Sequence, residues 1–80
     1  MSDAFKLVPN KWVTEDKLTE ITGMKHGTIE RARRKSWFAG REYVHVAPEG
    51  DPNPNTACMY NTDAINQWIE SQIAKQPSAR

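Results

Sequence analysis

The sequence has a single cysteine, no long hydrophobic run and almost no net charge, at a formal +1. A lone Cys58 cannot form an internal disulfide. No stretch approaches the roughly 20 apolar residues of a membrane span, or the apolar run of a signal peptide. We therefore expect a soluble cytoplasmic protein that has no membrane partner. Because Cys58 lies in an apolar-leaning run, we expect it to be a buried packing residue.

Residues suited to catalysis or metal binding are also scarce. His26, His45 and Cys58 are the only histidines and the only thiol, and their spacing matches no zinc pattern. No nucleophile has an evident base, and no glycine-rich phosphate loop or pair of carboxylates stands out. We predict that the protein is not an enzyme and that it holds neither a metal ion nor a cofactor.

The length of 80 residues suits one small domain. We expect a single domain over residues 1–80, with a core over about 12–74 and less order in 1–10 and 75–80. Large aromatic residues supply most of the core in a chain this short. We expect Trp12, Trp37 and Trp68 in that core, rather than on the surface stacking with single-stranded bases. We also expect Phe5, Leu7 and Val8 to dock on the domain.

The positive charge is concentrated in one segment. Six of the eleven basic residues lie between Lys25 and Arg41 against one acid, Glu30, so this segment has a formal charge of +5 and the remainder −4. A field of this kind attracts phosphate to one face and orients the approach of a nucleic acid. The alternative is a solvated basic surface that serves only solubility.

Two short helices are predicted around this segment. Thr14 is a suitable N-cap for a helix over residues 15–22, with Leu18 and Ile21 facing inward, and Gly23 suits its left-handed C-cap. A second helix follows almost at once and runs to about Lys35. Its buried residues are expected to be Ile29 and Ala32, after which Trp37 and Phe38 turn into the core.

The second half of the chain predicts a hairpin and a last helix. Extended formers occupy residues 41–47 and 56–60, on either side of a loop over 48–55 in which prolines and a glycine exclude regular structure. Asn61 caps a helix from Thr62 to about Ala74, which Pro77 ends. Its apolar stripe consists of Ile65, Trp68, Ile69 and Ile73.

This order of elements predicts an α+β fold, a small winged helix-turn-helix with two helices, a two-stranded wing hairpin and a C-terminal helix. The second helix of such a fold lies in the DNA major groove. We predict a DNA-binding site made of Lys25, His26, Gly27, Thr28, Arg31, Arg34, Lys35 and Arg41. Arg31 and Arg34 are the candidates for bidentate contacts with guanine edges or phosphate oxygens.

Several neighbouring side chains have other expected roles. Arg33 lies nearer the flank of this face. It is a candidate for DNA contact and equally for pairing with Glu30, and that pairing would leave it a structural or phosphate-only role. Glu42 is expected to pair with a neighbouring cation. The wing loop contains Glu49 and Asp51 but no Lys or Arg, so insertion of its tip into an electronegative minor groove is unfavourable.

The segment from Leu18 to Arg31 resembles the helix-turn-helix of small winged-helix domains related to the MerR regulators, and more closely that of phage excisionases. In the excisionase pattern a Thr-Val or Thr-Ile recognition helix rich in arginine precedes a wing that opens Gly-Arg-Glu-Tyr. Here Thr28-Ile29 and Gly40-Arg41-Glu42-Tyr43 stand in that order, and the start of the last helix, residues 61–64, is also similar. The chain departs from the pattern at Gly27 and Glu30, and Lys25 replaces the usual capping serine.

The resemblance implies a directionality factor in a bacterial host cell, without catalytic activity of its own. Such a protein binds double-stranded attachment-site DNA side by side with further copies, bends it, and directs a tyrosine integrase toward excision of a prophage. We expect a monomer in solution that self-associates cooperatively on DNA. A MerR-like transcriptional regulator of phage genes and a protein-interaction accessory module are the alternatives.

Overall fold

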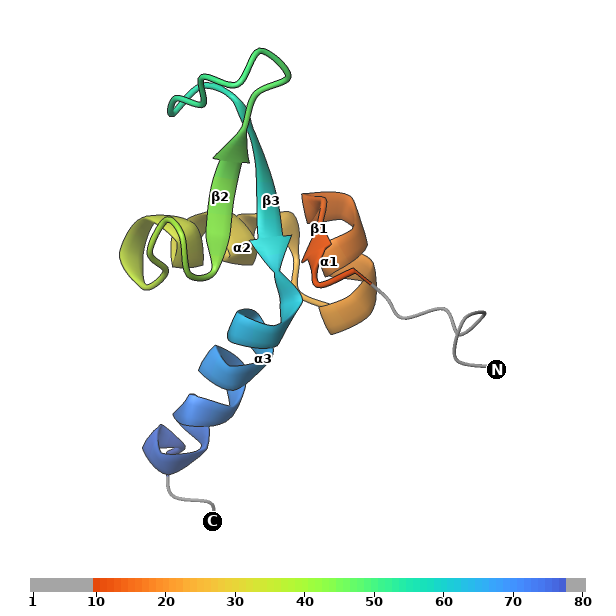
Figure 1. Cartoon of the computed structure of the whole chain (residues 1–80). Coiled ribbons are helices and arrows are strands. Elements are labelled where there is room, and N and C mark those ends of the chain that lie inside the picture. Colours follow the sequence, from red (N-terminus) through yellow and green to blue (C-terminus); the bar gives the residue numbers. More distant parts are fainter. Residues whose placement is uncertain (1–9, 78–80) are drawn as a thin grey trace, which may run out of the picture.

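The computed structural model describes residues 10–77 of the chain (Figure 1). Its elements follow the order β1 (Trp12–Val13), α1 (Glu15–Thr22), α2 (His26–Lys35), β2 (Tyr43–Val46), β3 (Ala57–Asn61), α3 (Thr62–Ser71) and the short 3-10 helix η2 (Gln72–Lys75). Three helices and a three-stranded antiparallel sheet confirm the predicted α+β winged-helix fold. Phe5, Leu7 and Val8 lie outside the described residues.

The helix ends follow from their capping residues. The Thr14 side chain accepts a hydrogen bond from the Lys17 amide, and Gly23 ends α1 at a φ of 80°, where a side chain would be strained. Asn61 caps α3 in the same way through the Ala64 amide. Lys25 precedes α2 without a side-chain capping bond. Because Gly23 ends α1 and α2 begins at His26, the connection between the two helices is only three residues long, 23–25.

The sheet has one strand more than the predicted hairpin. Its order is β1-β3-β2, and β1 pairs with β3 so that Trp12 lies opposite Asn61 and Val13 opposite Tyr60. The sequence prediction missed β1 because two residues are too short for an alternating pattern to appear. The backbone amide of Thr62 also donates to the carbonyl of Lys11 at 2.7 Å, so β1 holds the start of α3.

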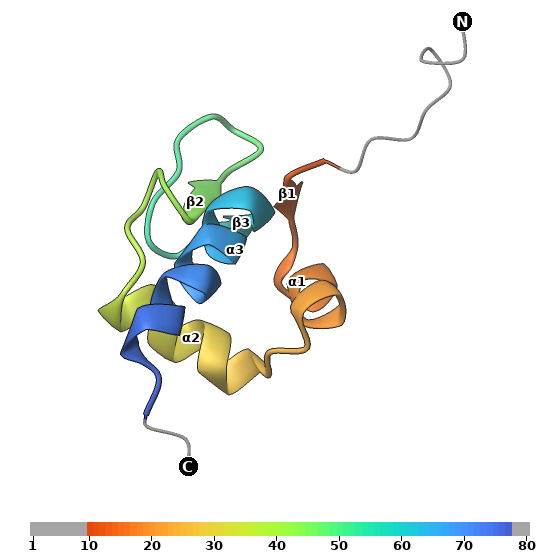
Figure 2. The same cartoon turned by 90° about the horizontal axis from the view of Figure 1, so that it is seen from below.

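The core lies where α1, α2, α3 and the sheet meet. Its buried residues are Leu18, Ile29, Ala32, Trp37, Tyr60 and Ile65. Trp37 contacts Tyr60 and Trp68 with edge-to-face rings, at centroid distances of 6.0 and 5.3 Å. Figure 2 shows α3 from below, with α2 behind it. The core therefore fixes α2 against α3 as well as against the sheet.

Several expectations about buried residues were wrong. Ile21 is 53% exposed and Phe38 is 63% exposed. Ile69 on α3 and Ile73 on η2 are also exposed, so the buried residues of the predicted stripe are reduced to Ile65, with Trp68 partly covered. The reason is geometric: α3 extends away from the sheet, on the side opposite the hairpin tip, and its later turns pass beyond the core (Figure 1).

Smaller differences concern α3, Cys58 and Trp12. The α-helical part of α3 ends at Ser71, and η2 carries the chain to Lys75, one residue beyond the predicted end. Cys58 is partly buried and packs against the core, where it faces His45 and Arg33 at 3.5 and 3.9 Å. Trp12 is half-buried in β1, whereas the sequence placed it in the core.

Candidate nucleic-acid interface

The predicted recognition helix, α2, presents most of the predicted site to solvent. Its Ile29 and Ala32 are buried, as predicted, and the opposite side carries exposed cations. The predicted residues Lys25, His26, Gly27, Arg31, Arg34 and Lys35 are exposed, and Thr28 is half-buried. Three cations also occupy the last turn of α2, where the negative end of the helix dipole stabilises positive charge. The structure therefore places the predicted residues 25–35 on α2 and its N-cap.

Glu30 pairs with Arg34. Nη2 of Arg34 lies 2.6 Å from Oε2 of Glu30, one helical turn away, and both side chains are substantially exposed. Of the two roles left open for Arg33, pairing with Glu30 is not the one found, because Arg33 turns toward Tyr60 in the sheet. In the described part of the chain Arg31 forms no ion pair, so its guanidinium is the less constrained of the two predicted reading groups.

Arg33 belongs to a network beneath the exposed face. Its Nη1 donates to the Tyr60 hydroxyl at 2.6 Å, and that hydroxyl donates to Oε1 of Glu15 at 3.1 Å. Burial raises the pKa of the Tyr60 phenol well above its ordinary value, although Arg33 acts in the opposite direction. Burial would lower the pKa of Arg33, but the hydrogen bond and charges around it raise the pKa overall. Both groups therefore keep their protons.

His26 connects the same network to the start of α2. Its Nδ1 lies 2.7 Å from Oε2 of Glu15, and its Nε2 lies 3.4 Å from Oδ1 of Asp16. The ring is still half-exposed, so it remains within reach of a ligand. The sequence offered no sign of these contacts, because Glu15 and Asp16 also suit the first turn of any helix.

Arg41 is fixed on the loop before the wing. Its Nε donates to Oε2 of Glu42 at 2.6 Å, and its guanidinium lies 4.7 Å from the centroid of the Phe38 ring. Glu42 is 3% exposed and also accepts the Phe38 amide at 2.9 Å. The prediction that Glu42 pairs with a neighbouring cation is confirmed. The geometry orients Arg41 while its side chain stays 57% exposed.

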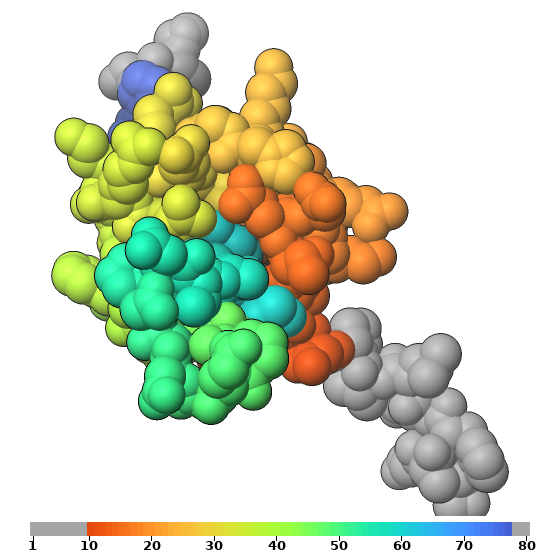
Figure 3. Space-filling view, turned by 90° about the horizontal axis from the view of Figure 1, so that it is seen from above, coloured from red at the N-terminus to blue at the C-terminus, as the bar shows by residue number. Residues whose placement is uncertain are grey.

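The wing and the recognition helix share one face of the molecule. In Figure 3 the yellow surface of α2 and the green-to-teal surface of the hairpin tip are both exposed on this face. The tip contains Glu49 and Asp51, both exposed, and residues 48–55 include no Lys or Arg. The hairpin tip therefore adds no positive charge, which lies instead on α2 and on Arg41 before β2.

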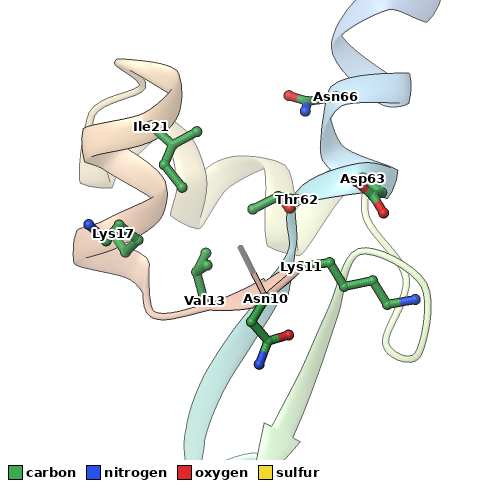
Figure 4. A pocket seen from close by; sticks show the side chains of 8 residues that line it. All are labelled: Asn10, Lys11, Val13, Lys17, Ile21, Thr62, Asp63 and Asn66. Atoms are coloured by element: carbon green, nitrogen blue, oxygen red, sulfur yellow. The ribbon is translucent and has the colours of Figure 1, made fainter. Parts of the chain in front are cut away.

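A hollow of about 760 Å³ lies between α1, β1 and the start of α3 (Figure 4). Val13 and Ile21 form its apolar part, and Lys11, Lys17 and Asp63 are the charged side chains around it.

Over residues 10–77, no group of three His, Cys, Asp or Glu side chains is arranged to hold a metal ion. The helices of this region are too short and too polar to cross a membrane.

A capped helix-turn-helix with an exposed cationic second helix, followed by a β-hairpin and a packed C-terminal helix, defines a small winged-helix protein. Residues 4–73 match the family described as "Putative excisionase (DUF1233)". The match spans most of the chain, so the protein belongs to this family, in agreement with the resemblance to phage excisionases. Comparison with curated proteins gives no match.

Proposed function

We propose that this protein is a DNA-binding excisionase that inserts α2 into the major groove of attachment-site DNA. The observation that supports this most directly is the exposed cationic side of α2, opposite Ile29 and Ala32. Membership of the excisionase family supports a role in phage excision. The protein acts by binding, and it contributes no catalytic group to the recombination.

Each predicted site residue has a role in this interface. Arg31 reads a guanine edge or a pair of phosphate oxygens, because its guanidinium forms no ion pair within residues 10–77. Arg34 does the same after leaving Glu30. Lys25 and Lys35 neutralise phosphates near the two ends of the helix, and Nε2 of His26 donates to phosphate after leaving Asp16. Gly27 and Thr28 bring the start of the helix close to the DNA, with the Thr28 methyl available to a thymine.

Arg41 contacts the backbone beside the adjacent minor groove. Its orientation by Glu42 and Phe38 means that little side-chain freedom is lost on binding. The acidic tip of the hairpin stays out of the groove, since Glu49 and Asp51 would be repelled by its negative potential. The wing therefore acts through its base.

Useful specificity requires more than one copy, because a domain of this size covers only a few base pairs. The protein is a monomer in solution and binds adjacent sites cooperatively, which bends the DNA and directs a tyrosine integrase toward excision. This takes place in the cytoplasm of the bacterial host, on the nucleoid.

The test is a gel shift on the attachment-site DNA beside the nearest integrase gene, using a circularly permuted probe set. Stepwise, cooperative complexes whose mobility depends on the position of the site support an excisionase that bends DNA. Tight, unbent binding at a promoter alone would instead indicate a transcriptional regulator.

The salt dependence of the same binding provides a second criterion. Each phosphate neutralised contributes about −0.9 to the slope of log K against log salt on duplex DNA. A steep slope is therefore expected. Weak binding without sequence preference at every salt concentration would overturn the proposal and favour a protein partner for the basic face.

A further inference from the structure

We propose that Glu15 is a positioning residue for the recognition helix, α2. Its carboxylate contacts His26 at the start of α2, and it contacts Arg33, two turns later, together with Tyr60 of β3. These contacts hold α2 against α1 and β3. The inference rests on the proposed function, because it concerns how α2 is held for DNA. Glu15 lies in α1 and belongs to no predicted contact surface.

The two oxygens of Glu15 serve different ends of the recognition helix. Oε2 lies 2.7 Å from Nδ1 of His26, the first residue of α2. Oε1 accepts the Tyr60 hydroxyl at 3.1 Å and lies 3.8 Å from Nη1 of Arg33. His26 and Arg33 are seven residues apart, which is about 10 Å along a helix axis. One carboxylate therefore contacts α2 at two separated points.

Two such points constrain the helix more than one would. A single contact leaves a helix free to pivot about it, whereas contacts at both ends of a two-turn span resist rotation and sliding. His26, Ile29 and Arg33 lie on nearly the same stripe of α2, with the apolar residue between the two polar contacts. The exposed groups on the other side of the helix are thereby held in register with the wing.

The burial of the network makes the arrangement specific. Tyr60 is fully buried, and the side chains of Glu15 and Arg33 are only 32% and 27% exposed. Partly desolvated charged hydrogen bonds are stronger and more directional than those on an open surface. Glu15 therefore has a geometric role in addition to the favourable position of an acid at a helix N-terminus.

The sign of the expected effect separates this role from simple electrostatics. Removing an acid near a DNA-binding face ordinarily raises affinity for any DNA, because one repulsion disappears. If Glu15 positions α2, its removal lowers affinity for the correct site and spares nonspecific binding. Glu20 provides the matched control, since it is an exposed acid of the same helix whose one ion pair among the described residues is with Lys17, at 2.9 Å.

The experiment compares Glu15→Gln, Glu15→Asp and Glu20→Gln with the wild-type protein, on an attachment-site duplex and a scrambled duplex of equal length. Circular dichroism first establishes that each variant is folded under the binding conditions. We expect both Glu15 variants to lose about 3- to 30-fold of their affinity for the attachment site alone. Glu15→Asp is informative because it keeps the negative charge, while its shorter side chain cannot contact both His26 and Tyr60.

Glu20→Gln is expected to bind both duplexes at least as tightly as the wild type. Tighter or unchanged binding of the attachment site by Glu15→Gln, as for Glu20→Gln, would overturn the inference.

A readout without DNA distinguishes failure of this inference from failure of the proposed function. In amide NMR spectra of the free protein, Glu15→Gln is expected to shift resonances throughout His26–Lys35, whereas Glu20→Gln shifts only its own surroundings. Lack of site preference in the wild type would reject the proposed function. Unmoved α2 resonances in Glu15→Gln would reject the positioning role, whatever the wild type binds.

Discussion

Nη1 of Arg33 lies 2.6 Å from the hydroxyl oxygen of Tyr60, and this contact joins the recognition helix to the central strand of the sheet. The bond is the only direct polar side-chain link between α2 and the tyrosines of the described sheet. The bond gives the buried Tyr60 hydroxyl a polar partner, and it orients the Arg33 guanidinium toward the sheet. The stability of the domain should therefore depend on that hydroxyl.

Tyr60→Phe is expected to lower the free energy of unfolding by about 1 to 2 kcal/mol, because Arg33 and Glu15 lose their shared partner in a partly desolvated place. Urea unfolding followed by circular dichroism measures the change. Tyr43→Phe is the control, since Tyr43 lies opposite Tyr60 on β2 and its hydroxyl forms no hydrogen bond within residues 10–77. Equal losses in the two variants would contradict a specific role for the Tyr60 hydroxyl.

The proton on Tyr60 makes stability depend on alkaline pH. Because the folded-state pKa is raised, the contribution is fully present below the unfolded pKa of about 10 and is lost as pH rises above it. In that window the unfolded chain releases a proton that the folded chain retains. The free energy of unfolding should then fall by up to about 1.4 kcal/mol per pH unit from this group.

The measurement is urea unfolding at a series of pH values from neutral to alkaline. Tyr60→Phe should show a shallower decline than the wild type above pH of about 10. Parallel declines in the two proteins would mean that Tyr60 titrates normally in the folded state.

The pair formed by Arg34 and Glu30 predicts opposite effects on DNA binding. Arg34→Ala should cost about 1 to 3 kcal/mol of specific binding. Glu30→Gln should strengthen binding, because it frees Arg34 and removes a negative charge from the exposed face. The free energy of unfolding of both variants should lie within about 0.5 kcal/mol of the wild-type value, since exposed i,i+4 pairs contribute little to stability.

Salt titrations of the same variants show what Arg34 contacts. A loss of about 1 from the salt slope in Arg34→Ala indicates a phosphate, whereas an unchanged slope with relaxed sequence preference indicates a base. Unaltered affinity in Arg34→Ala would mean that this side of α2 does not face the DNA.

The aromatic core predicts a ranking of two tryptophan variants. Trp37→Ala should lower the free energy of unfolding by about 3 to 5 kcal/mol, because Trp37 is 4% exposed and packs on Tyr60 and Trp68. Trp68→Ala should cost less, since that side chain is only partly covered. Far-UV circular dichroism is the appropriate probe because both changes alter fluorescence. Equal costs would indicate that Trp68 is as buried as Trp37.

Gly27 separates stability from binding. It lies inside α2. Apart from its chain neighbours and the backbone of its own helix, no atom of the described residues lies within 4 Å of the position that an added methyl group would occupy. Gly27→Ala should therefore stabilise the free domain by about 0.5 to 1 kcal/mol. If the start of α2 approaches DNA closely, the same methyl should weaken binding. Thermal unfolding and gel shifts on one preparation test both effects.

Unchanged DNA affinity in Gly27→Ala would indicate that the start of α2 remains clear of the DNA. Gly23→Ala is the contrasting variant for stability, because Gly23 has a φ of 80° and this change should destabilise the domain.

The helices were predictable because their signals are local. Thr14, Gly23 and Asn61 define helix ends through bonds to residues a few positions away, and the observed bounds of α1 and α2 agree with the prediction. The buried side of α2 followed from the spacing of Ile29 and Ala32. The family resemblance rested on equally short motifs, and the family match confirms it.

What the sequence could not predict depends on contacts between distant residues. Ile21 and Ile69 have the spacing of buried helix positions, yet they are exposed because no element within residues 10–77 covers them. Arg33 is one of several neighbouring cations, and its hydrogen bond with Tyr60, 27 residues away, cannot be read from its neighbours in the sequence. Local patterns do not contain such information.

The separation of Glu15 from Tyr60 along the chain also has a kinetic consequence. These partners are 45 residues apart, whereas α1 and α2 are neighbours. During synthesis the two helices can associate before Tyr60 and the strand that carries it have been made. In a nascent chain α2 therefore gains its final orientation only after β3 has followed it out of the ribosome.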